Sequence, residues 1–122
     1  MLFRSNTDGF MLSTPFASGW SVSDAGDVNG DGLSDVAVTA PAYNVRQGEA
    51  FIVYGKSDGS PVVTGSSSFV AASQGFVIEG GMVDGYTAAL STVSSGDVNG
   101  DGLSDIIAGA WFTNNEIGRA HV

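Results

Sequence analysis

The sequence contains no cysteine and only four Lys and Arg residues among its 122 positions. Without cysteine, neither a disulfide framework nor a thiolate metal site can form. Thirteen Asp and Glu residues give a formal net charge of −9, and the basic clusters that nucleic acids and anionic lipid surfaces attract are missing. We therefore expect no nucleic-acid partner, and cations are the natural counterpart of this chain.

Long hydrophobic runs are also missing. No apolar run approaches the roughly 20 residues that span a bilayer, so we expect no membrane insertion. The first ten residues, MLFRSNTDGF, lack the apolar core of a signal peptide. Glycine, by contrast, occupies 18 positions and hydrophobic residues make up 43% of the chain. This composition predicts many turns around a buried core.

Both ends of the chain resemble translated sequencing-library adapters. Residues 1–5 read MLFRS, and residues 117–122 read IGRAHV, a translation of ATC GGA AGA GCA CAC GTC. We predict that both segments derive from adapter read-through, which leaves a natural segment from about residue 6 to about residue 116. The alternative is that GRAHV begins a genuine strand. No catalytic role is assigned to the basic residues in these segments: His121, Arg4 and Arg119.

The decapeptide GDVNGDGLSD occurs twice, at residues 26–35 and 96–105. The similarity continues downstream, where DVAVTAP in the first copy aligns with DIIAGAW in the second. A repeat at an offset of 70 residues indicates that each copy is one supersecondary module. The second copy carries about four extra residues between Tyr86 and Asp97, which we interpret as a bulge or a longer strand entry.

Residue types predict short strands and essentially no helix. Residues 36–40 and 106–110 are small and β-branched, which is typical of buried strands. Residues 49–55 (EAFIVYG) and 75–81 (GFVIEGG) have the same character, and the segment between them is rich in turn residues. Each repeat thus holds roughly four antiparallel strands, the number in a propeller blade.

The repeated loop is rich in oxygen ligands. Side-chain oxygens fall at its positions 1, 3, 5 and 9, where alternate residues of a tight loop can surround one point, and a carbonyl can fill position 7. Hard oxygen donors select Ca²⁺ over transition metals, so we predict two calcium sites. The first would use Asp27, Asn29, Asp31, the carbonyl of Leu33, and Asp35. The second would use Asp97, Asn99, Asp101, the carbonyl of Leu103, and Asp105.

Spacing separates these loops from other calcium loops. An EF-hand needs Glu at position 12, where this chain has Val38 in one copy and Ala108 in the other. Gly32 would supply the sharp turn before position 7. The alternative is a simple turn, which Asp, Asn and Gly all favour. Three carboxylates in one short loop repel one another unless a cation or protons neutralise them, and this favours the metal site.

Other candidate residues have weaker support. Trp20, Tyr86 and Trp111 could stack on a glycan, but large aromatic residues more often pack in cores. Glu79 and Asp84 could form an acid/base pair, although their glycine-rich surroundings favour a solvated surface. No G-x-S-x-G sequence is present. We therefore predict no catalytic residues and no enzyme activity.

The order of the motifs resembles the FG-GAP repeat of integrin alpha-chain β-propellers and of many large bacterial surface proteins. GWSV is followed by GDVNGDGLSD, by an apolar strand ending in TAP, and by GEAFIVYG. Gly19-Trp20 corresponds to the FG element and Thr39-Ala40-Pro41 to GAP, whereas Gly109-Ala110-Trp111 lacks the proline. The resemblance covers most of residues 16 to 116.

This resemblance implies an all-β fold of antiparallel four-stranded blades from an incomplete β-propeller, with calcium-binding hairpin loops between the first and second strands. It implies a first repeat over residues 6–81 and a partial second repeat over residues 82–116, followed by the adapter segment. Two blades cannot close a ring, so the expected partners are the other blades of the same propeller or further protomers.

The resemblance also implies a function. We expect a calcium-binding, non-catalytic module of a surface or secreted protein, located outside the cell or on its surface. Its role would be adhesion or protein interaction, with a protein or glycan ligand. Two alternatives stay open: the non-catalytic part of a propeller-containing polysaccharide lyase or hydrolase, and a carbohydrate-binding propeller.

Overall fold

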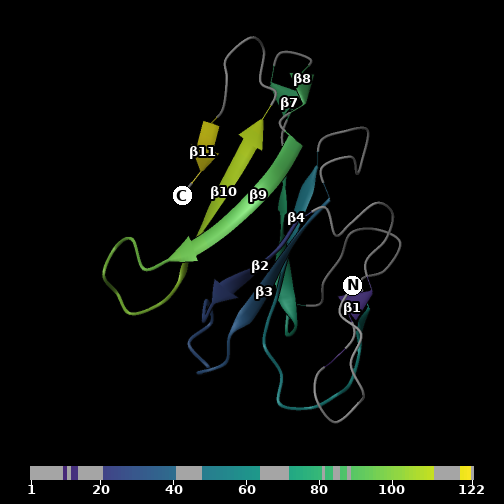
Figure 1. Cartoon of the computed structure of the whole chain (residues 1–122), viewed down its shortest axis with the longest axis vertical. Helices are drawn as coiled ribbons and strands as arrows, with labels where there is room; N and C mark the ends of the chain where they lie inside the picture. Colours follow the sequence, from purple (N-terminus) through teal and green to yellow (C-terminus); the bar gives the residue numbers. More distant parts are fainter. Residues whose placement is uncertain are drawn as a thin grey trace.

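The computed structural model describes residues 10, 12–13, 21–40, 48–63, 72–80, 82–83, 86–87, 89–111 and 119–121. Every regular element within these ranges is a β-strand, and none is a helix. Two larger sheets dominate the molecule (Figure 1). The all-β architecture predicted from the sequence is therefore confirmed.

The first sheet is a complete four-stranded blade. Its strands are β2 (Ser21–Gly26), β3 (Asp35–Ala40), β4 (Glu49–Val53) and β6 (Gly75–Glu79), in the order β2-β3-β4-β6. Every neighbouring pair is antiparallel. All five side chains of β4 are buried, which agrees with its β-branched and aromatic sequence. This is the strand number and pairing that the sequence predicts for one repeat.

The second sheet repeats the first with three strands. They are β9 (Ala89–Gly96), β10 (Asp105–Trp111) and β11 (Arg119–His121), in the order β11-β10-β9. Ala110 pairs with Arg119, as Ala40 pairs with Glu49 in the first sheet, so the register is the same after a shift of 70 residues. The alternative that GRAHV begins a strand agrees with this pairing, whereas the adapter origin of residues 117–122 concerns the source DNA and stays a prediction.

The extra residues of the second copy lengthen its first strand and add an irregularity. β9 has eight residues, whereas β2 has six. Along the β9–β10 pair, Gly109 faces Thr92 but Ala110 faces Leu90, so Ser91 has no residue opposite. Both parts of the prediction, a bulge and a longer strand, are present.

Two short strand pairs lie beside the main sheets. β7 (Met82–Val83) pairs antiparallel with β8 (Tyr86–Thr87). β1 (Leu12–Ser13) pairs with β5 (Val62–Val63) in the parallel direction. The sequence reasoning considered only antiparallel pairing. No tight turn joins β1 to β5, so nothing local imposes the antiparallel direction on them.

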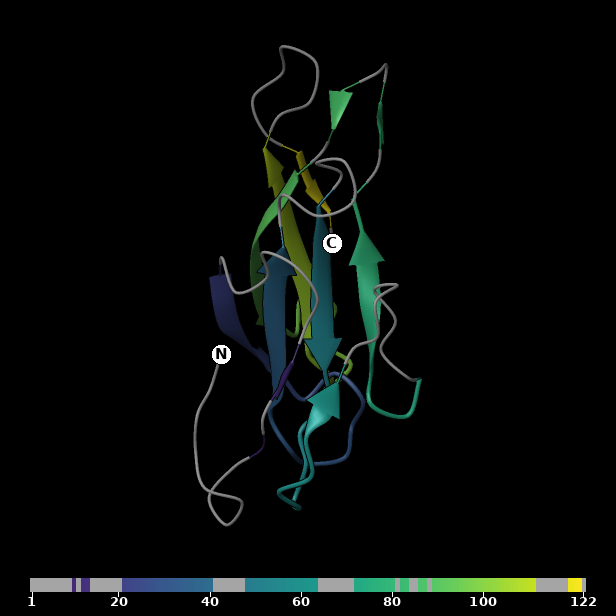
Figure 2. The same cartoon turned by 90° about the vertical axis from the view of Figure 1, so that its right-hand side faces the viewer.

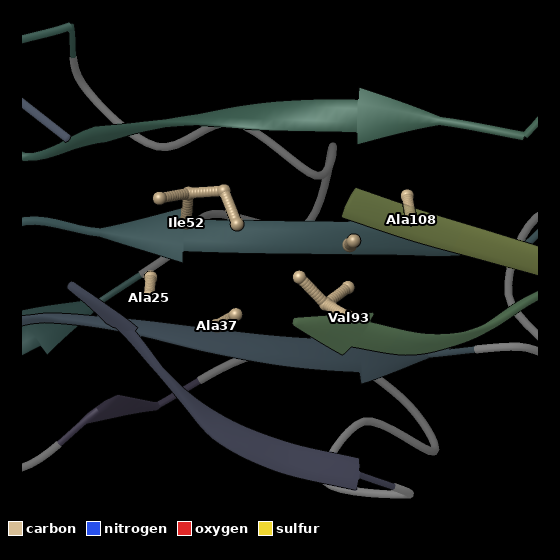
Figure 3. Close-up of a cluster of buried hydrophobic side chains, with 6 residues drawn as sticks. Ala25, Ala37, Ile52, Val93 and Ala108 are labelled. Carbon is tan, nitrogen blue, oxygen red and sulfur yellow. The ribbon is translucent and has the colours of Figure 1, made fainter. Parts of the chain in front are cut away.

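The two sheets pack face to face (Figure 2). Their common core is made mostly of small side chains, and in Figure 3 the labelled ones lie in the layer between the strands. Small side chains let two sheets approach closely while still excluding water. The cluster contains Ala25, Ala37, Ala50 and Ile52 from the first sheet, and Val93 and Ala108 from the second.

The first sheet is also buried on its other face. Ala40 and Phe51 form a second buried cluster with Val77 packed against it. Side chains alternate between the faces of a strand, so Val38 lies on this face while Ala37 lies toward the second sheet. Ala108, the counterpart of Val38 in the repeat, lies toward the first sheet. The second sheet therefore turns its Ala108 face toward the first sheet, whereas the first sheet turns its Ala37 face toward the second. This is the head-to-tail stacking expected of successive repeats.

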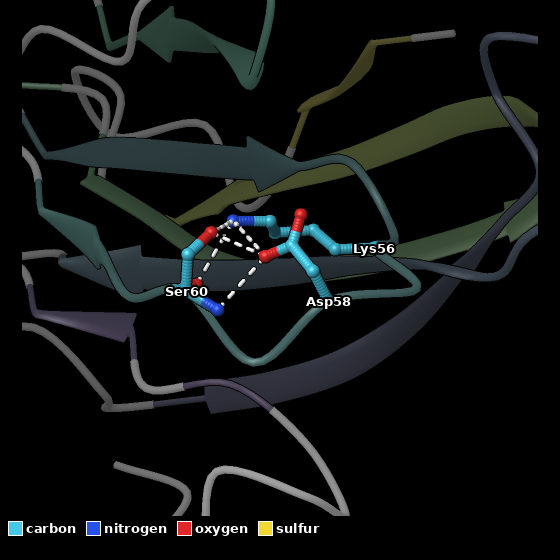
Figure 4. Close-up of polar contacts among 3 residues, drawn as sticks. All are labelled: Lys56, Asp58 and Ser60. Atoms are coloured by element: carbon cyan, nitrogen blue, oxygen red, sulfur yellow. Dashed lines mark hydrogen bonds and ion pairs between the residues drawn. The ribbon is translucent and has the colours of Figure 1, made fainter.

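Three polar residues close the connection that follows β4 (Figure 4). Asp58 accepts a hydrogen bond of 2.8 Å from the Ser60 amide and another from the Ser60 hydroxyl. The Lys56 ammonium lies 3.2 Å from the Asp58 carboxylate and donates to the Ser60 carbonyl at 2.9 Å. The hydrogen bonds from Ser60, followed by Lys56, lower the pKa of Asp58 from 3.8 to about 2.

Gly75 is a position of the first sheet that has no room for a side chain. Its φ is +152°, and a Cβ there would overlap the carbonyl oxygen of Ile52, which is backbone and cannot move aside. We expect Gly75→Ala to lower the free energy of unfolding by about 3 kcal/mol, measured by urea denaturation. Gly96→Ala is the matched control, since a Cβ at Gly96 meets nothing within 4 Å. Equal effects of the two substitutions would contradict this packing.

The Asp58 cluster predicts an acid transition of the loop. Because the folded pKa of about 2 lies below the ordinary value of 3.8, the hydrogen bonds stabilise the loop above pH 3.8, and this contribution is lost as the pH falls toward 2. The carboxyl resonance of Asp58, followed by NMR, should titrate with a midpoint near 2. In Ser60→Ala the midpoint should rise toward 3.8. A wild-type midpoint at 3.8 would show that the bonds do not form in solution.

Candidate functional site

In each of the two main sheets, one acidic loop connects the first strand to the second. Loop 1, residues 27–34, joins β2 to β3, and loop 2, residues 97–104, joins β9 to β10. Asp35 and Asp105, the first residues of the following strands, complete the two motifs. The placement of each loop between the first two strands of its sheet is the one that the resemblance to the FG-GAP repeat implies (Figure 1).

The carboxylate of Asp27 organises the turn of loop 1. Its Oδ1 accepts hydrogen bonds from the amides of Gly30 at 2.7 Å and Asp31 at 3.1 Å, and its Oδ2 accepts one from the amide of Gly32 at 2.8 Å. One side chain therefore satisfies three consecutive backbone N–H groups. Bonds of this kind to an ionised acceptor are stronger than neutral ones.

The other oxygen-bearing side chains extend this network. Asn29 Oδ1 accepts from the Asp31 amide at 3.0 Å, and Asp31 Oδ1 accepts from the Leu33 amide at 2.8 Å. The Asn29 side-chain amide donates to Asp31 Oδ2 at 2.9 Å. Asp35 Oδ2 accepts from the Val28 amide at 2.9 Å, which ties the end of the motif to its beginning. All four predicted side-chain ligands of the first site thus belong to one connected network.

Loop 2 forms the same seven hydrogen bonds at equivalent positions. Its identical sequence therefore folds into the same local structure although it lies in a different sheet. The donors are Val98, Asn99, Gly100, Asp101, Gly102 and Leu103, and the acceptors are Asp97, Asn99, Asp101 and Asp105.

Glycines with a left-handed backbone make these turns possible. Gly32 has a φ of +85° and Gly102 has a φ of +89°. Residues with a Cβ adopt this left-handed region only at a cost. The sequence-based expectation that Gly32 supplies the sharp turn agrees with this backbone conformation.

The closing aspartates of the two motifs have different surroundings. The Asp35 side chain is 1% exposed, and its Oδ1 accepts a second bond of 2.7 Å from the Gly55 amide. A Cβ on Gly55 would lie 2.5 Å from the Ser34 carbonyl oxygen, so only glycine allows the chain after β4 to approach this closely. Asp105 is only partly buried. Sequence reasoning missed the Gly55 contact, although the glycine that ends the predicted strand 49–55 was a visible signal.

Backbone amides also stabilise the ionised form of the first acid in loop 2. The amide of Gly102, and then those of Gly100 and Asp101, lower the pKa of Asp97. Loss of hydration raises the pKa of Asp97 in part, but the hydrogen bonds from the three amides outweigh it. The ionised form of this carboxylate is therefore favoured.

The donor chemistry of both loops fits Ca²⁺, although the arrangement is not that of a closed metal site. Among the residues that the structure describes, no group of three or more His, Cys, Asp or Glu side chains is arranged to hold a metal ion. The carboxylates point to the amides of their own loop. An ionised carboxylate has about four lone-pair sites, and Asp31 uses only two of them. Every candidate donor is a hard oxygen, as Ca²⁺ prefers.

Most of the remaining candidate side chains lie outside the described part of the chain. Trp20 and Asp84 lie outside the described residues. Tyr86 begins β8 and Trp111 ends β10, and their side chains are outside the described part as well. Glu79 ends β6, exposed to solvent. The glycan-binding and acid/base interpretations therefore stay untested predictions.

No helix among the described residues is long and apolar enough to cross a membrane.

The segments that hold the two loops match a known repeat family. Residues 18–54 and 89–122 match the FG-GAP repeat. The first segment runs from just before β2 to just after β4, and the second covers β9, β10 and β11. The matched boundaries therefore follow the two sheets described above.

Curated relatives include proteins of two kinds. The chain is 35% identical over 107 residues to integrin alpha pat-2 of Caenorhabditis briggsae, with 80% of this chain and 7% of the relative covered. It is 37% identical over 87 residues to mouse integrin alpha-M, covering 70% and 7%. It is 33% identical over 113 residues to human phosphatidylinositol-glycan-specific phospholipase D, covering 88% and 13%.

The chain spans only 7 to 13% of the length of these relatives. No solved structure matches it significantly. The two segments that match the repeat make up more than half of the chain, and each carries one acidic loop between its first two strands. The chain therefore belongs to the FG-GAP repeat family, whose repeats are blades of β-propellers.

Proposed function

We propose that this chain is a calcium-binding pair of propeller repeats from a surface or secreted protein, and that it serves adhesion or protein interaction without a catalytic step of its own. Residues 6–81 would form the first blade and residues 82–116 the start of the second. Each loop would bind one Ca²⁺ through the ligands assigned above, Asp27 to Asp35 and Asp97 to Asp105.

The observation that carries this proposal is the repeated loop network. Each motif, residues 27–35 and 97–105, places three carboxylates and one amide oxygen within nine residues and contains no Lys or Arg. The same seven hydrogen bonds occur in both copies. A turn alone needs neither three charges nor their repetition, because Asn and Ser form the same turns without repulsion.

Calcium would act in these loops as a structural ion. The ion would neutralise the like charges and hold β2 against β3, and β9 against β10, at one end of each sheet. Binding to the folded state alone stabilises it in proportion to occupancy. Extracellular modules bind Ca²⁺ in the range of about 10⁻⁴ to 10⁻³ M, which suits a protein outside the cell.

The relatives named integrin alpha support a role in adhesion at the cell surface. Loops gathered at one end of a blade are where propellers offer exposed, variable residues to partners. A protein or glycan would be the ligand, and the remaining blades of the propeller would be the permanent partners of this chain.

One alternative has its own support. Relatives named phosphatidylinositol-glycan-specific phospholipase D match over 80% or more of the chain. In that setting the repeats would be the non-catalytic part of a larger hydrolase. The complete coding sequence distinguishes the adhesion module from this alternative, because a linked hydrolase domain favours the enzyme. The same coding sequence tests whether residues 1–5 and 117–122 derive from adapters.

Thermal unfolding of the 122-residue chain in calcium and in EDTA tests the proposal. We expect calcium at 100 times the dissociation constant to add about 2.7 kcal/mol for each occupied loop, and the double variant Asp31→Ala, Asp101→Ala to remove this gain. These two residues are exposed, and within the described ranges each side chain accepts from one backbone amide and one Asn side chain. Their loss should therefore change the EDTA sample little, unlike loss of the buried Asp35.

A second double variant controls for net charge. The double variant Asp58→Ala, Glu79→Ala also removes two negative charges, but at positions outside the loops. Its rise in unfolding temperature with calcium should therefore equal that of the wild type. If the folded wild type has the same unfolding temperature in calcium and in EDTA, the loops are turns only and the calcium proposal fails.

A further inference from the structure

The two acidic loops touch each other although they belong to different sheets. The amide of Ser104 in loop 2 donates a hydrogen bond of 3.0 Å to the carbonyl oxygen of Asp27 in loop 1. Nothing in the sequence pattern of either repeat predicts this bond, because it depends on how the second sheet stacks on the first.

Side chains tighten the same contact. Gly26 has a φ of +66°, and a Cβ there would overlap the hydroxyl of Ser104 and lie 2.7 Å from the Ser104 Cβ. A Cβ on Gly30 would lie 3.2 Å from a methyl group of Leu103. Leu103 and Ser104 therefore pack against the backbone at Gly26, the last residue of β2, and at Gly30 in loop 1.

The contact lies inside both proposed ligand sets. Asp27 is the first ligand of loop 1. Ser104 stands between Leu103 and Asp105, which are the last two ligands of loop 2. A cation that fixes the Leu103 carbonyl and the Asp105 carboxylate also fixes the peptide that carries the Ser104 amide. Through its hydrogen bond to the Asp27 carbonyl, this amide then fixes the backbone of the first proposed ligand of loop 1.

We propose that Ser104 couples the two loops, so that calcium in one loop raises the calcium affinity of the other. This inference rests on the proposed calcium function and adds a cooperative mechanism to it. A loop that is already ordered by its neighbour loses less conformational freedom when it binds. The coupling is reciprocal by thermodynamic necessity, so each loop should affect the other by the same factor.

The chain contains its own matched control position. Ser34 occupies in loop 1 the place that Ser104 occupies in loop 2. Within the described residues, the Ser34 amide makes no backbone hydrogen bond like that of Ser104. Proline lacks the amide hydrogen, so Ser104→Pro removes the bond between loops, whereas Ser34→Pro makes the same chemical change where no such bond exists.

Calcium titration of the ¹⁵N-labelled 122-residue chain measures the two loops separately. The amide signals of Gly30 and Gly32 report loop 1, and those of Gly100 and Gly102 report loop 2. We expect Asp101→Ala, which disables loop 2, to weaken calcium binding at loop 1 about five-fold or more. Asp31→Ala should weaken binding at loop 2 by the same factor. Titrations in 1 M KCl, where the Debye length is about 3 Å, exclude a simple effect of charge.

The serine variants then assign the coupling to the contact. In the Ser104→Pro background, adding Asp101→Ala should leave the affinity of loop 1 unchanged, whereas in the Ser34→Pro background it should weaken loop 1 as in the wild type. The reciprocal pair of aspartate variants needs no change at Ser104, so the coupling is measured even where Ser104→Pro does not fold.

Three outcomes overturn the proposal. If both loops bind calcium and Asp101→Ala leaves loop 1 unchanged, the loops are independent and only the coupling fails. If the effect of Asp101→Ala persists in Ser104→Pro, the coupling runs through another contact. If neither loop binds calcium, the proposed function and the coupling fail together.

Discussion

The close packing of the two sheets across small side chains is the constraint on which the rest of the structure depends. Ala25, Ala37 and Ala50 present little more than methyl groups, so β9 can lie against the first sheet with Val93 between them (Figure 3). At this separation side chains reach the neighbouring backbone, as Ser23 does in donating to the Val93 carbonyl at 2.9 Å. The two acidic loops lie at the ends of strands held in this way, and their contact follows from it.

Within each loop a second constraint applies, because the same oxygens serve two purposes. The carboxylates must satisfy backbone amides that no strand or helix pairs, since an unsatisfied amide is costly. They also concentrate negative charge in loops that contain no Lys or Arg. A turn organised by ionised side chains is therefore well ordered, but no basic residue of the loop neutralises its negative charge. This combination gives the loop its specific backbone and is the basis of the calcium binding proposed above.

The sequence predicted some elements of this fold well and missed others, for identifiable reasons. The strands from Glu49 and from Gly75 are visible in local composition, and the loop network follows from side chains within a few residues of the amides they bind. The parallel pairing of β1 with β5 and the bond from Gly55 to Asp35 are not visible in this way. Both join segments that are separated along the chain and brought together by the stacking of strands.

By itself, the sequence determined the local structure: antiparallel strands of β-branched residues, and two identical turns whose glycines allow the left-handed backbone that the acids then stabilise. These features depend on residues a few positions apart, so identical decapeptides fold identically in two different sheets. Only the tertiary structure decided how the copies meet. Asp35 is buried beside Gly55, and the amide of Ser104 binds the carbonyl of Asp27. The physical reason is that burial and contacts between loops depend on which sheet face lies against which neighbour, and identical local sequences carry no information about their neighbours.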